Sequence, residues 1–446
     1  MIDFDYWSPT YIAFGKGKES RAGELVRRFG GRKALVHYGG GSAVRSGLLA
    51  RVKAALAEAG VAFAELGGVK PNPRSSLVEE GVRLALAEGV DFLLAIGGGS
   101  VIDSSKAIAI GAANGGEWRR FYVGKEVKVR PVIPAALPVG VVLTIAAAGS
   151  EGSTNSIINL EPGNLKRGAG GDILRPKFAI LNPELTMTLP PFQTACGLAD
   201  MFAHLCERYF SPTRDVTLTD NLCEAVMRTV VEESAKVMAD PSDYQARANV
   251  MWAGTLAHND ICGAGRVQDW ASHGIEHELS ALYDCAHGAG LAVVMPAWMT
   301  YVHKTDPARF ARFARNVFGV GHGIEHELSA LYDCAHGAGL AVVMPARMTY
   351  VHKTDPARFA RFARNVFDVG HGVPDADAAR AGIAAFRSWL KSLGLPLTFA
   401  ELGAKEEDIP LLVKTLNLSG NTLGGFQPLT ENDVAAIYRL CLAPNA

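Results

Sequence analysis

An aspartate and four histidines are spaced so that they could bind a divalent metal ion. Asp200 and His204 lie four residues apart in a helical pattern, so their side chains project from one helix face. His273, His277 and His287 follow later in the chain. An Asp/His pair alone is commonly a surface hydrogen bond, but one carboxylate with three imidazoles suits Fe(II), Zn(II), Mn(II) or Co(II). We therefore predict a metal site formed by Asp200, His204, His273 and His287.

The two later ligands cannot lie on one straight helix. His273 and His287 are 14 residues apart, which is about 21 Å at a rise of ~1.5 Å per residue and too far for one ion. The sequence therefore predicts a helix break near Tyr283-Asp284, with His287 opening the next helix. His277, one helical turn beyond His273, is placed to relay a proton. A purely structural role for His277 is the alternative.

Two glycine-rich turns follow strand-like runs and could bind a phosphate group. They are Gly39 to Ser42 and Gly97 to Lys106. Glycines let the backbone approach a pyrophosphate, and the free N–H groups of a helix start favour the anion. Such turns are also common simply as tight turns, and neither has the GxGxxG spacing. The first turn has no acidic residue and is followed by Arg45, which favours NADP(H) over NAD(H), unless Arg45 is merely solvent-exposed.

The elements that must position these residues fall into two domains. The chain of 446 residues is long enough for two hydrophobic cores. Up to about residue 185, short apolar runs alternate with amphipathic helical patterns, which is typical of an α/β domain, and helical patterns take over after Pro190-Pro191. We predict an α/β dinucleotide-binding domain over residues 1–187 and an all-helical metal-binding domain over residues 188–446.

An internal repeat interrupts the second domain. Residues 273–321 recur as residues 322–370, and only Trp298/Arg347 and Gly319/Asp368 differ. Solenoid repeats diverge and come in threes or more. This pair therefore indicates a tandem duplication inside a finished fold, or an error of sequence assembly.

The second copy offers an alternative pair of metal ligands, His322 and His336. The first copy keeps its own lead-in, residues 268–272, whereas the second copy follows Gly319-Val320-Gly321, which are poor helix formers. The second copy also places Arg347 in an apolar run where the first has Trp298. These differences favour the first copy as the source of the metal ligands; the alternative is that the second copy packs natively and displaces the first.

Composition excludes several classes of partner. Lys plus Arg total 44 against 45 for Asp plus Glu, so the net charge of -1 offers no field for nucleic acid or an anionic membrane. No apolar stretch approaches the ~20 residues of a membrane span, and no basic region followed by an apolar run opens the chain. The seven cysteines are irregularly spaced without a CxxC pair, as in proteins of reducing compartments. We expect a cytoplasmic protein that acts on a small molecule.

As a set, these residues resemble the iron-containing (group III) alcohol dehydrogenase family, especially its butanol dehydrogenase and broad-range aldehyde reductase branch. The resemblance covers essentially the whole chain, including Pro9 to Gly17, Lys70 to Pro73 and Gly149 to Glu151. It implies a Rossmann-like domain followed by an all-α metal-binding domain, the dehydroquinate synthase-like fold. It also implies reduction of short to medium aliphatic aldehydes, such as butanal, to primary alcohols. A glycerol dehydrogenase-like polyol oxidoreductase, or a duplication-damaged scaffold with little activity, is the alternative.

The resemblance also implies roles for individual residues. The family's metal ligands match Asp200, His204, His273 and His287, and its nearby catalytic histidine matches His277. Its cofactor-binding positions match Gly39, Gly40, Ser42, Gly97, Gly98, Gly99, Ser100, Asp103, Thr144 and Lys166. NADP(H) or NAD(H), one Fe(II) or Zn(II) ion and a homodimer are implied as well. Two features depart from the family pattern: Ala146 and Ala148 replace a proline and a threonine, and the duplication is additional.

Overall fold

The computed structural model describes residues 1–306, apart from 125, 126 and 128, and scattered residues beyond them. The later described residues are 309–310, 312–313, 317, 387–388, 391–392, 394, 397–402, 405–416, 418–422, 430–440 and 442. The whole second copy of the repeat, with His322 and His336, lies outside the described residues.

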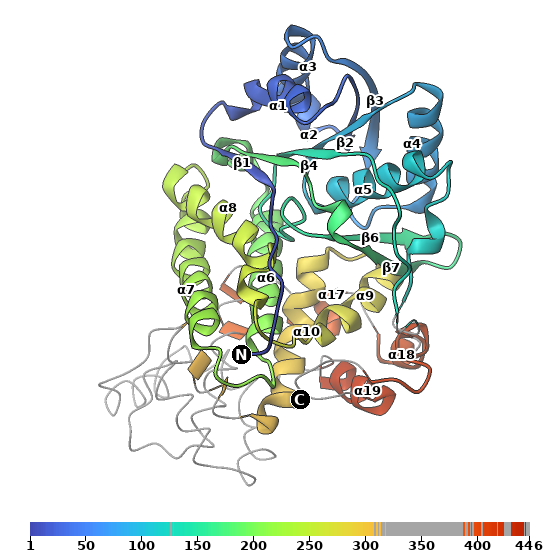
Figure 1. The fold of residues 1–446 in the computed structure, drawn as a ribbon. Coiled ribbons are helices and arrows are strands. Elements are labelled where there is room, and N and C mark those ends of the chain that lie inside the picture. Colours follow the sequence, from blue (N-terminus) through green and yellow to red (C-terminus); the bar gives the residue numbers. More distant parts are fainter. Residues whose placement is uncertain are drawn as a thin grey trace. The chain divides into compact units, whose positions relative to one another are not determined.

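A six-stranded parallel sheet organises the N-terminal part of the chain (Figure 1). Its strands are β1 (Tyr11–Phe14), β2 (Lys33–Gly39), β3 (Ala62–Val69), β4 (Phe92–Gly97), β5 (Val139–Leu143) and β8 (Phe178–Leu181). They lie in the order β1-β8-β5-β4-β2-β3, and each neighbouring pair is parallel. A strand covered on both faces needs apolar residues at successive positions, and every residue of β4 is buried.

Helices cover both faces of this sheet. They are α1 (Ala22–Arg28), α2 (Ser42–Arg45), α3 (Leu48–Glu58), α4 (Ser75–Ala87) and α5 (Gly99–Ala113). Successive strand side chains point to opposite faces, so Leu94 shares a hydrophobic core with α1 and α3, whereas Leu93 shares one with α4 and α5. The predicted α/β architecture is confirmed.

The connections of the sheet diverge between β2 and β4. From β2 the chain passes to β3 on one side, and from β3 it crosses to β4 on the other side of β2. In open α/β sheets, ligands bind outside the carboxyl ends of the strands at such a switch point. The turns at this point are the two glycine-rich turns, which begin at Gly39 and Gly97.

An antiparallel hairpin lies between β5 and β8 in the sequence. Its strands are β6 (Asn155–Leu160) and β7 (Leu165–Gly170). The hairpin packs against α5, where one Asp103 carboxylate oxygen accepts a 2.9 Å hydrogen bond from the Ile157 N–H. The hairpin is therefore tied to the helix that begins at the second glycine-rich turn.

Helices make up the regular structure after β8, and no strand follows it among the described residues. The longer ones are α6 (Pro191–Tyr209), α7 (Thr217–Ala239), α8 (Tyr244–His258), α9 (Ala271–Tyr283) and α10 (His287–Val302). Shorter ones are α17 (Phe399–Leu402), α18 (Ile409–Leu416) and α19 (Glu431–Leu440). Nearly every residue of α10 is buried, so this helix is a core element without a solvent face.

The chain divides into two compact units. One comprises Met1–Asp5, Leu198–Met238 and Cys262–Ala446, and the other comprises Tyr6–Gly197 and Ala239–Ile261. The division into domains 1–187 and 188–446 stays a prediction. Among the described helices, none combines the length and the apolar character that crossing a membrane requires.

Candidate functional site

Helix α6 carries three buried titratable side chains on one face. Asp200, His204 and Glu207 occupy positions i, i+4 and i+7, which places them above one another. Asp200 and His204 are each 4% exposed, and Glu207 is 0% exposed. Burying ionisable groups is costly unless they have partners. The alternative that Asp200 and His204 form only a surface hydrogen bond is therefore wrong.

Helices α9 and α10 meet at the predicted break. Helix α9 ends at Tyr283, Asp284 adopts a left-handed conformation with φ of 52°, and α10 begins at His287. The reversal brings the ring centroids of His273 and His287 to 5.2 Å. The predicted helix break is confirmed.

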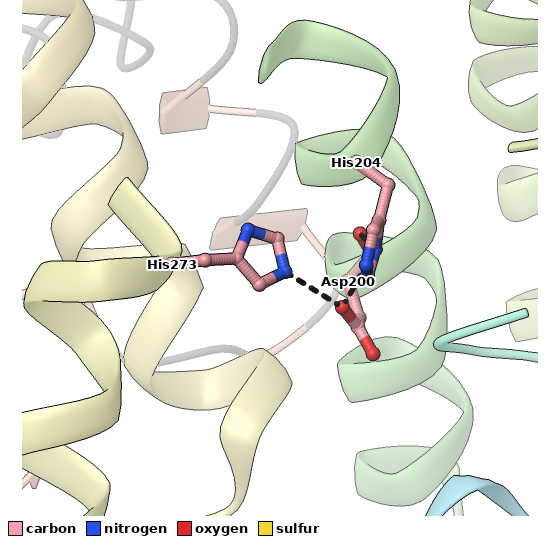
Figure 2. A group of neighbouring side chains, drawn as sticks. All are labelled: Asp200, His204 and His273. Carbon is pink, nitrogen blue, oxygen red and sulfur yellow. Dashed lines mark hydrogen bonds and ion pairs between the residues drawn. The ribbon is translucent and has the colours of Figure 1, made fainter. Parts of the chain in front are cut away.

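The Asp200 carboxylate lies among the histidines (Figure 2). Its Oδ1 is 3.1 Å from His204 Nδ1, 3.6 Å from His273 Nε2 and 3.8 Å from His287 Nε2. Figure 2 shows the His273 ring extending from α9 toward the Asp200 and His204 side chains of α6. The ligand atoms of Asp200, His204 and His273 all lie within 4.8 Å of one another. His287 Nε2 approaches the same Asp200 oxygen, and the ligand atoms of His287, Glu276 and His277 form a second group within 4.8 Å of one another. The alternative ligands from the second copy, His322 and His336, lie outside the described residues.

The donor atoms fit a small divalent cation. Metal–ligand bonds of ~2.0–2.2 Å place neighbouring atoms of a tetrahedral site about 3.4 Å apart, close to the 3.6 and 3.8 Å between Asp200 Oδ1 and the two Nε2 atoms. Asp200 Oδ1 and His273 Nε2 are buried and have no hydrogen-bond partner among the described residues. Buried polar atoms without a hydrogen bond are costly, and one metal ion would satisfy both.

Two buried carboxylates contact the Nδ1 atoms of His273 and His287. Glu207 Oε2 accepts a hydrogen bond from His273 Nδ1, and Oε1 accepts bonds from the Ser272 hydroxyl and from the His273 N–H at 2.9 Å. Glu276 Oε2 contacts His287 Nδ1. A carboxylate at Nδ1 fixes the tautomer whose Nε2 lone pair is available to a metal.

The roles of Glu207 and Glu276 were not predicted from the sequence, although the spacing of each from a predicted ligand was visible there. Glu207 continues the face of Asp200 and His204 at i+7, and Glu276 lies three residues after His273. The spacing does not reveal the pairing, because Glu276 contacts His287 on the next helix and not His273, its neighbour in the sequence.

The charges of the cluster shift the protonation of its members. Burial by itself raises the pKa of Asp200, but the nearby histidines, His204 foremost, hold that pKa well below its usual value. Burial lowers the pKa of His204. Burial also works against a protonated His273, but the Glu207 carboxylate raises the pKa of this histidine to about 9. The Glu207 carboxylate therefore favours the protonated form of His273, and a metal ion at Nε2 would compete with that proton.

His277 lies at the edge of the cluster. Its ring centroid is 5.4 Å from that of His287 and 6.1 Å from that of His273. The side chain is partly exposed, whereas Asp200, His204 and His273 are buried. His277 therefore has access both to solvent and to the neighbourhood of the predicted ligands.

The glycine-rich turns lie at the carboxyl ends of the adjacent strands β2 and β4. At the first turn, Gly39 ends β2, Gly40 follows and Ser42 begins α2. At the second, Gly97 ends β4, Gly98 is the residue before α5, and Gly99 and Ser100 begin α5. A Cβ atom at Gly98 would lie 2.1 Å from Ile145 Cγ2, so a larger residue does not fit there without rearrangement. Free N–H groups at a helix start favour an anion, and binding of a phosphate group at this turn stays a prediction.

The other predicted cofactor residues belong to the same unit. Thr144 follows β5, and its N–H donates a 3.1 Å hydrogen bond to the carbonyl of Gly97. Asp103 accepts a 2.6 Å hydrogen bond from the Ser150 hydroxyl. Lys166 donates a 3.1 Å hydrogen bond to Asn72 Oδ1. Their contacts with a cofactor stay predictions.

Lys106, the last residue of the second glycine-rich motif, is fully buried. Its ammonium group donates to the backbone carbonyls of Ser150, Ser153 and Asn155 at 2.8, 3.0 and 2.8 Å. Burial lowers its pKa to about 8. Lys106 therefore anchors the loop after β5 to α5, a role that the sequence did not reveal.

Comparisons with known proteins cover nearly the whole chain. Residues 9–183 match the profile "Iron-containing alcohol dehydrogenase", and residues 194–321 and 313–442 each match "Fe-containing alcohol dehydrogenase family, C-terminal". The chain is 36% identical to NADH-dependent butanol dehydrogenase A of Clostridium acetobutylicum, over 98% of this chain and 99% of that protein. It is 33% identical to the NADPH-dependent aldehyde reductase YqhD of Escherichia coli, over 98% and 99% of the two chains.

Solved structures agree with these matches. The crystal structure of NADH-dependent butanol dehydrogenase A from Thermotoga maritima is 36% identical, covers 99% of each chain and superposes with a TM-score of 0.82. That similarity extends through the α/β part and the helical part alike. The family uses a metal ion and a nicotinamide cofactor, and relatives include both NADH and NADPH users. The chain is an oxidoreductase that belongs to the iron-containing alcohol dehydrogenase family.

Proposed function

We propose that the chain reduces short to medium aliphatic aldehydes, such as butanal, to primary alcohols, with one Fe(II) or Zn(II) ion and a reduced nicotinamide cofactor. The relatives named above as butanol dehydrogenases and an aldehyde reductase support this substrate class. The convergence of Asp200 with His204, His273 and His287 in a mostly buried cluster carries the proposal. Metal-assisted reduction of a carbonyl group requires that the metal ligands lie close together, as these four residues do.

When bound, the ion would supply Lewis acidity toward a carbonyl oxygen, and the reduced nicotinamide would supply a hydride. The residues of the chain hold the ion and manage the proton. Glu207 holds the Nδ1 proton of His273, so that Nε2 faces Asp200. His277, which is partly exposed at the edge of the cluster, passes a proton to the product oxygen directly or through water.

NADP(H) is our proposed preference over NAD(H). Strand β2 ends in His37-Tyr38-Gly39 and β3 ends in Gly67-Gly68-Val69, so neither strand ends in a carboxylate for a ribose 2'-hydroxyl. Arg45 is exposed in α2 and has no ion-pair partner among the described residues. Its guanidinium is therefore free to bind a 2'-phosphate. Initial rates with NADPH and NADH across concentration would test this preference.

The first copy of the repeat is our proposed source of the metal ligands. Trp298 of this copy is 0% exposed, and its ring lies 6.0 Å from that of Phe210. The second copy has Arg347 at the equivalent position, and burying a guanidinium in an apolar site is costly. The core position of Trp298 therefore accepts the residue of the first copy and disfavours the residue of the second copy.

A homodimer and a cytoplasmic location complete the proposal. Strand β1 is an edge of the described sheet, and Tyr6 and Trp7 just before it are 42% and 57% exposed, which suits an interface between copies. The described cysteines are free thiols, as expected in a reducing compartment. Light scattering and cell fractionation would test the two statements.

The decisive experiment measures butanal-dependent oxidation of NADPH and NADH on protein whose metal content is known. The intact chain is compared with a chain that lacks residues 322–370. Comparable turnover with about one ion per chain in both proteins is the expected result. An intact chain without metal or turnover, rescued by the deletion, would mean that the duplication disables the enzyme. Faster oxidation of glycerol than reduction of butanal would favour the polyol alternative.

A further inference from the structure

The Glu276 carboxylate is completely enclosed where α9 packs against α10. Its side chain is 0% exposed, and Oε2 contacts Nδ1 of His287. A carboxylate in such a place is unfavourable unless a polar partner compensates for the lost water. The imidazole of His287, in ion-pair contact with Oε2, is one such partner.

Space for this carboxylate exists because residue 290 is glycine. A Cβ atom at Gly290 would lie 2.6 Å from Glu276 Oε1 and 3.1 Å from its carboxyl carbon. Gly290 lies inside α10, where its backbone conformation does not require glycine. Glycine is unfavourable within a helix. Its presence here is explained by the carboxylate that occupies the space of a side chain.

Among the predicted ligands, His287 most needs an orienting partner. Its side chain is 24% exposed, against 8% for His273 and 6% for His204. Packing therefore restricts the His287 ring least. His273 has Glu207 at Nδ1, and His204 has the backbone carbonyl of Asp200 at 2.9 Å from Nδ1. Glu276 supplies a carboxylate at the corresponding place, because its Oε2 contacts Nδ1 of His287.

We propose that Glu276 is a positioning residue for the metal centre, and that Gly290 is small in order to accommodate it. The carboxylate holds the Nδ1 proton of His287 and directs Nε2 toward Asp200 Oδ1, which lies 3.8 Å away. This inference rests on the proposed metal site. It adds a second carboxylate–histidine pair to the pair formed by Glu207 and His273.

The test measures metal affinity directly, without turnover. Zn(II) dissociation constants come from competition with a chromophoric chelator, and Co(II) absorption spectra report the ligand geometry. Glu276→Ala should raise the dissociation constant about 10- to 100-fold and change the Co(II) spectrum. Glu276→Gln should recover part of the affinity, because its amide oxygen still accepts the Nδ1 proton of His287.

Gly290→Ala provides a steric probe of the same contact. It should weaken Zn(II) binding when Glu276 is present and have no further effect in a Glu276→Ala background, because the clash is then absent. The duplication offers matched controls with the same local sequence, Glu325→Ala and Gly339→Ala. Both controls should bind Zn(II) as the unaltered chain does.

Each outcome has a distinct meaning. An unaltered chain that binds no Zn(II) would overturn the proposed metal site itself. Normal Zn(II) binding that Glu276→Ala leaves unchanged would overturn only the role of Glu276. Additive effects of Glu276→Ala and Gly290→Ala would overturn the steric link between them. A loss in Glu325→Ala equal to that in Glu276→Ala would overturn the placement of this role in the first copy. Melting of the metal-free proteins identifies variants that fail to fold, for which Glu276→Gln replaces Glu276→Ala.

Discussion

The metal cluster and the glycine-rich turns would bind their expected ligands with different parts of the chain. The cluster uses side chains of Asp200, His273 and His287, which come from three helices, α6, α9 and α10. The turn after β4 offers backbone N–H groups at the start of α5, within a few residues of one another. A side-chain site depends on each contributing atom, whereas a backbone site depends on local shape. Substitutions should therefore have larger and more specific effects in the cluster than at the turns.

The largest effect is expected for His273→Ala. Removing this imidazole deletes a predicted metal ligand and removes the donor to Oε2 of the buried Glu207 carboxylate. Metal affinity should fall by more than about 100-fold, beyond the range seen for orienting residues alone, and turnover should fall with it. Elemental analysis and NADPH titration would measure metal and cofactor separately, and cofactor binding should persist.

The repeat provides the control for this variant. His322→Ala removes the matching histidine of the second copy and should change neither metal content nor turnover. The reverse result, with metal lost in His322→Ala and kept in His273→Ala, would assign the site to the second copy.

His277→Ala should separate proton transfer from metal binding within the cluster. We expect kcat to fall about 100-fold, the low end of the range for general acid catalysis, with metal content unchanged. The partial exposure of His277 and its 6.1 Å ring separation from His273 are the basis for this result. Loss of the metal together with kcat would instead make His277 a ligand or a structural residue.

Lys106→Met tests whether the second glycine-rich turn depends on the contacts by which Lys106 anchors the loop after β5 to α5. The variant leaves the carbonyls of Ser150, Ser153 and Asn155 without their shared donor, and it should lower the free energy of unfolding by about 2–4 kcal/mol. The dissociation constant for NADPH should rise several-fold, with metal content unchanged. Lys53→Met is the matched control, because Lys53 makes an ion pair with Glu65, with side chains 34% and 31% exposed, and lies over the Phe63 ring at 5.5 Å from its centroid. Equal destabilisation by the two variants would contradict the anchoring role of Lys106.

The smallest effect is expected for Gly39→Asp, which adds a carboxylate where β2 ends. A side chain fits there, since a Cβ atom would lie 3.5 Å from Val69 O and 3.9 Å from Val101 Cγ2. The new charge should raise KM for NADPH about 10-fold, corresponding to ~1.4 kcal/mol, and leave KM for NADH unchanged or lower. Steady-state kinetics with both cofactors would measure the change. A parallel rise for both would show that the first turn does not select between them.

Much of the site could be predicted because its signals are local. The i, i+4 spacing of Asp200 and His204 places them on one face in any helix, and the 14 residues between His273 and His287 require a break wherever both bind one ion. Apolar runs followed by glycines likewise predicted two of the strands, β2 and β4, and their turns. The contribution of these glycines to cofactor binding is still a prediction.

Other features could not be predicted because they depend on neighbours that are distant in sequence. Glu276 lies beside His277 in the chain, yet its carboxylate contacts His287 across the helix break, in space left by Gly290. Lys106 belongs to a motif that suggests phosphate binding, but it is buried against the loop after β5, which contains Ser150.

The sequence by itself determined the α/β architecture, the candidate ligands and the helix break, because hydrophobic periodicity and helix geometry act over a few residues. Only the tertiary structure decided which oxygen faces each imidazole nitrogen and which charged groups lose contact with water. The physical reason is that hydrogen bonding and burial depend on distances between whole helices. Those distances are set when Asp200 of α6 and His273 of α9 pack together, and no spacing along the chain encodes them.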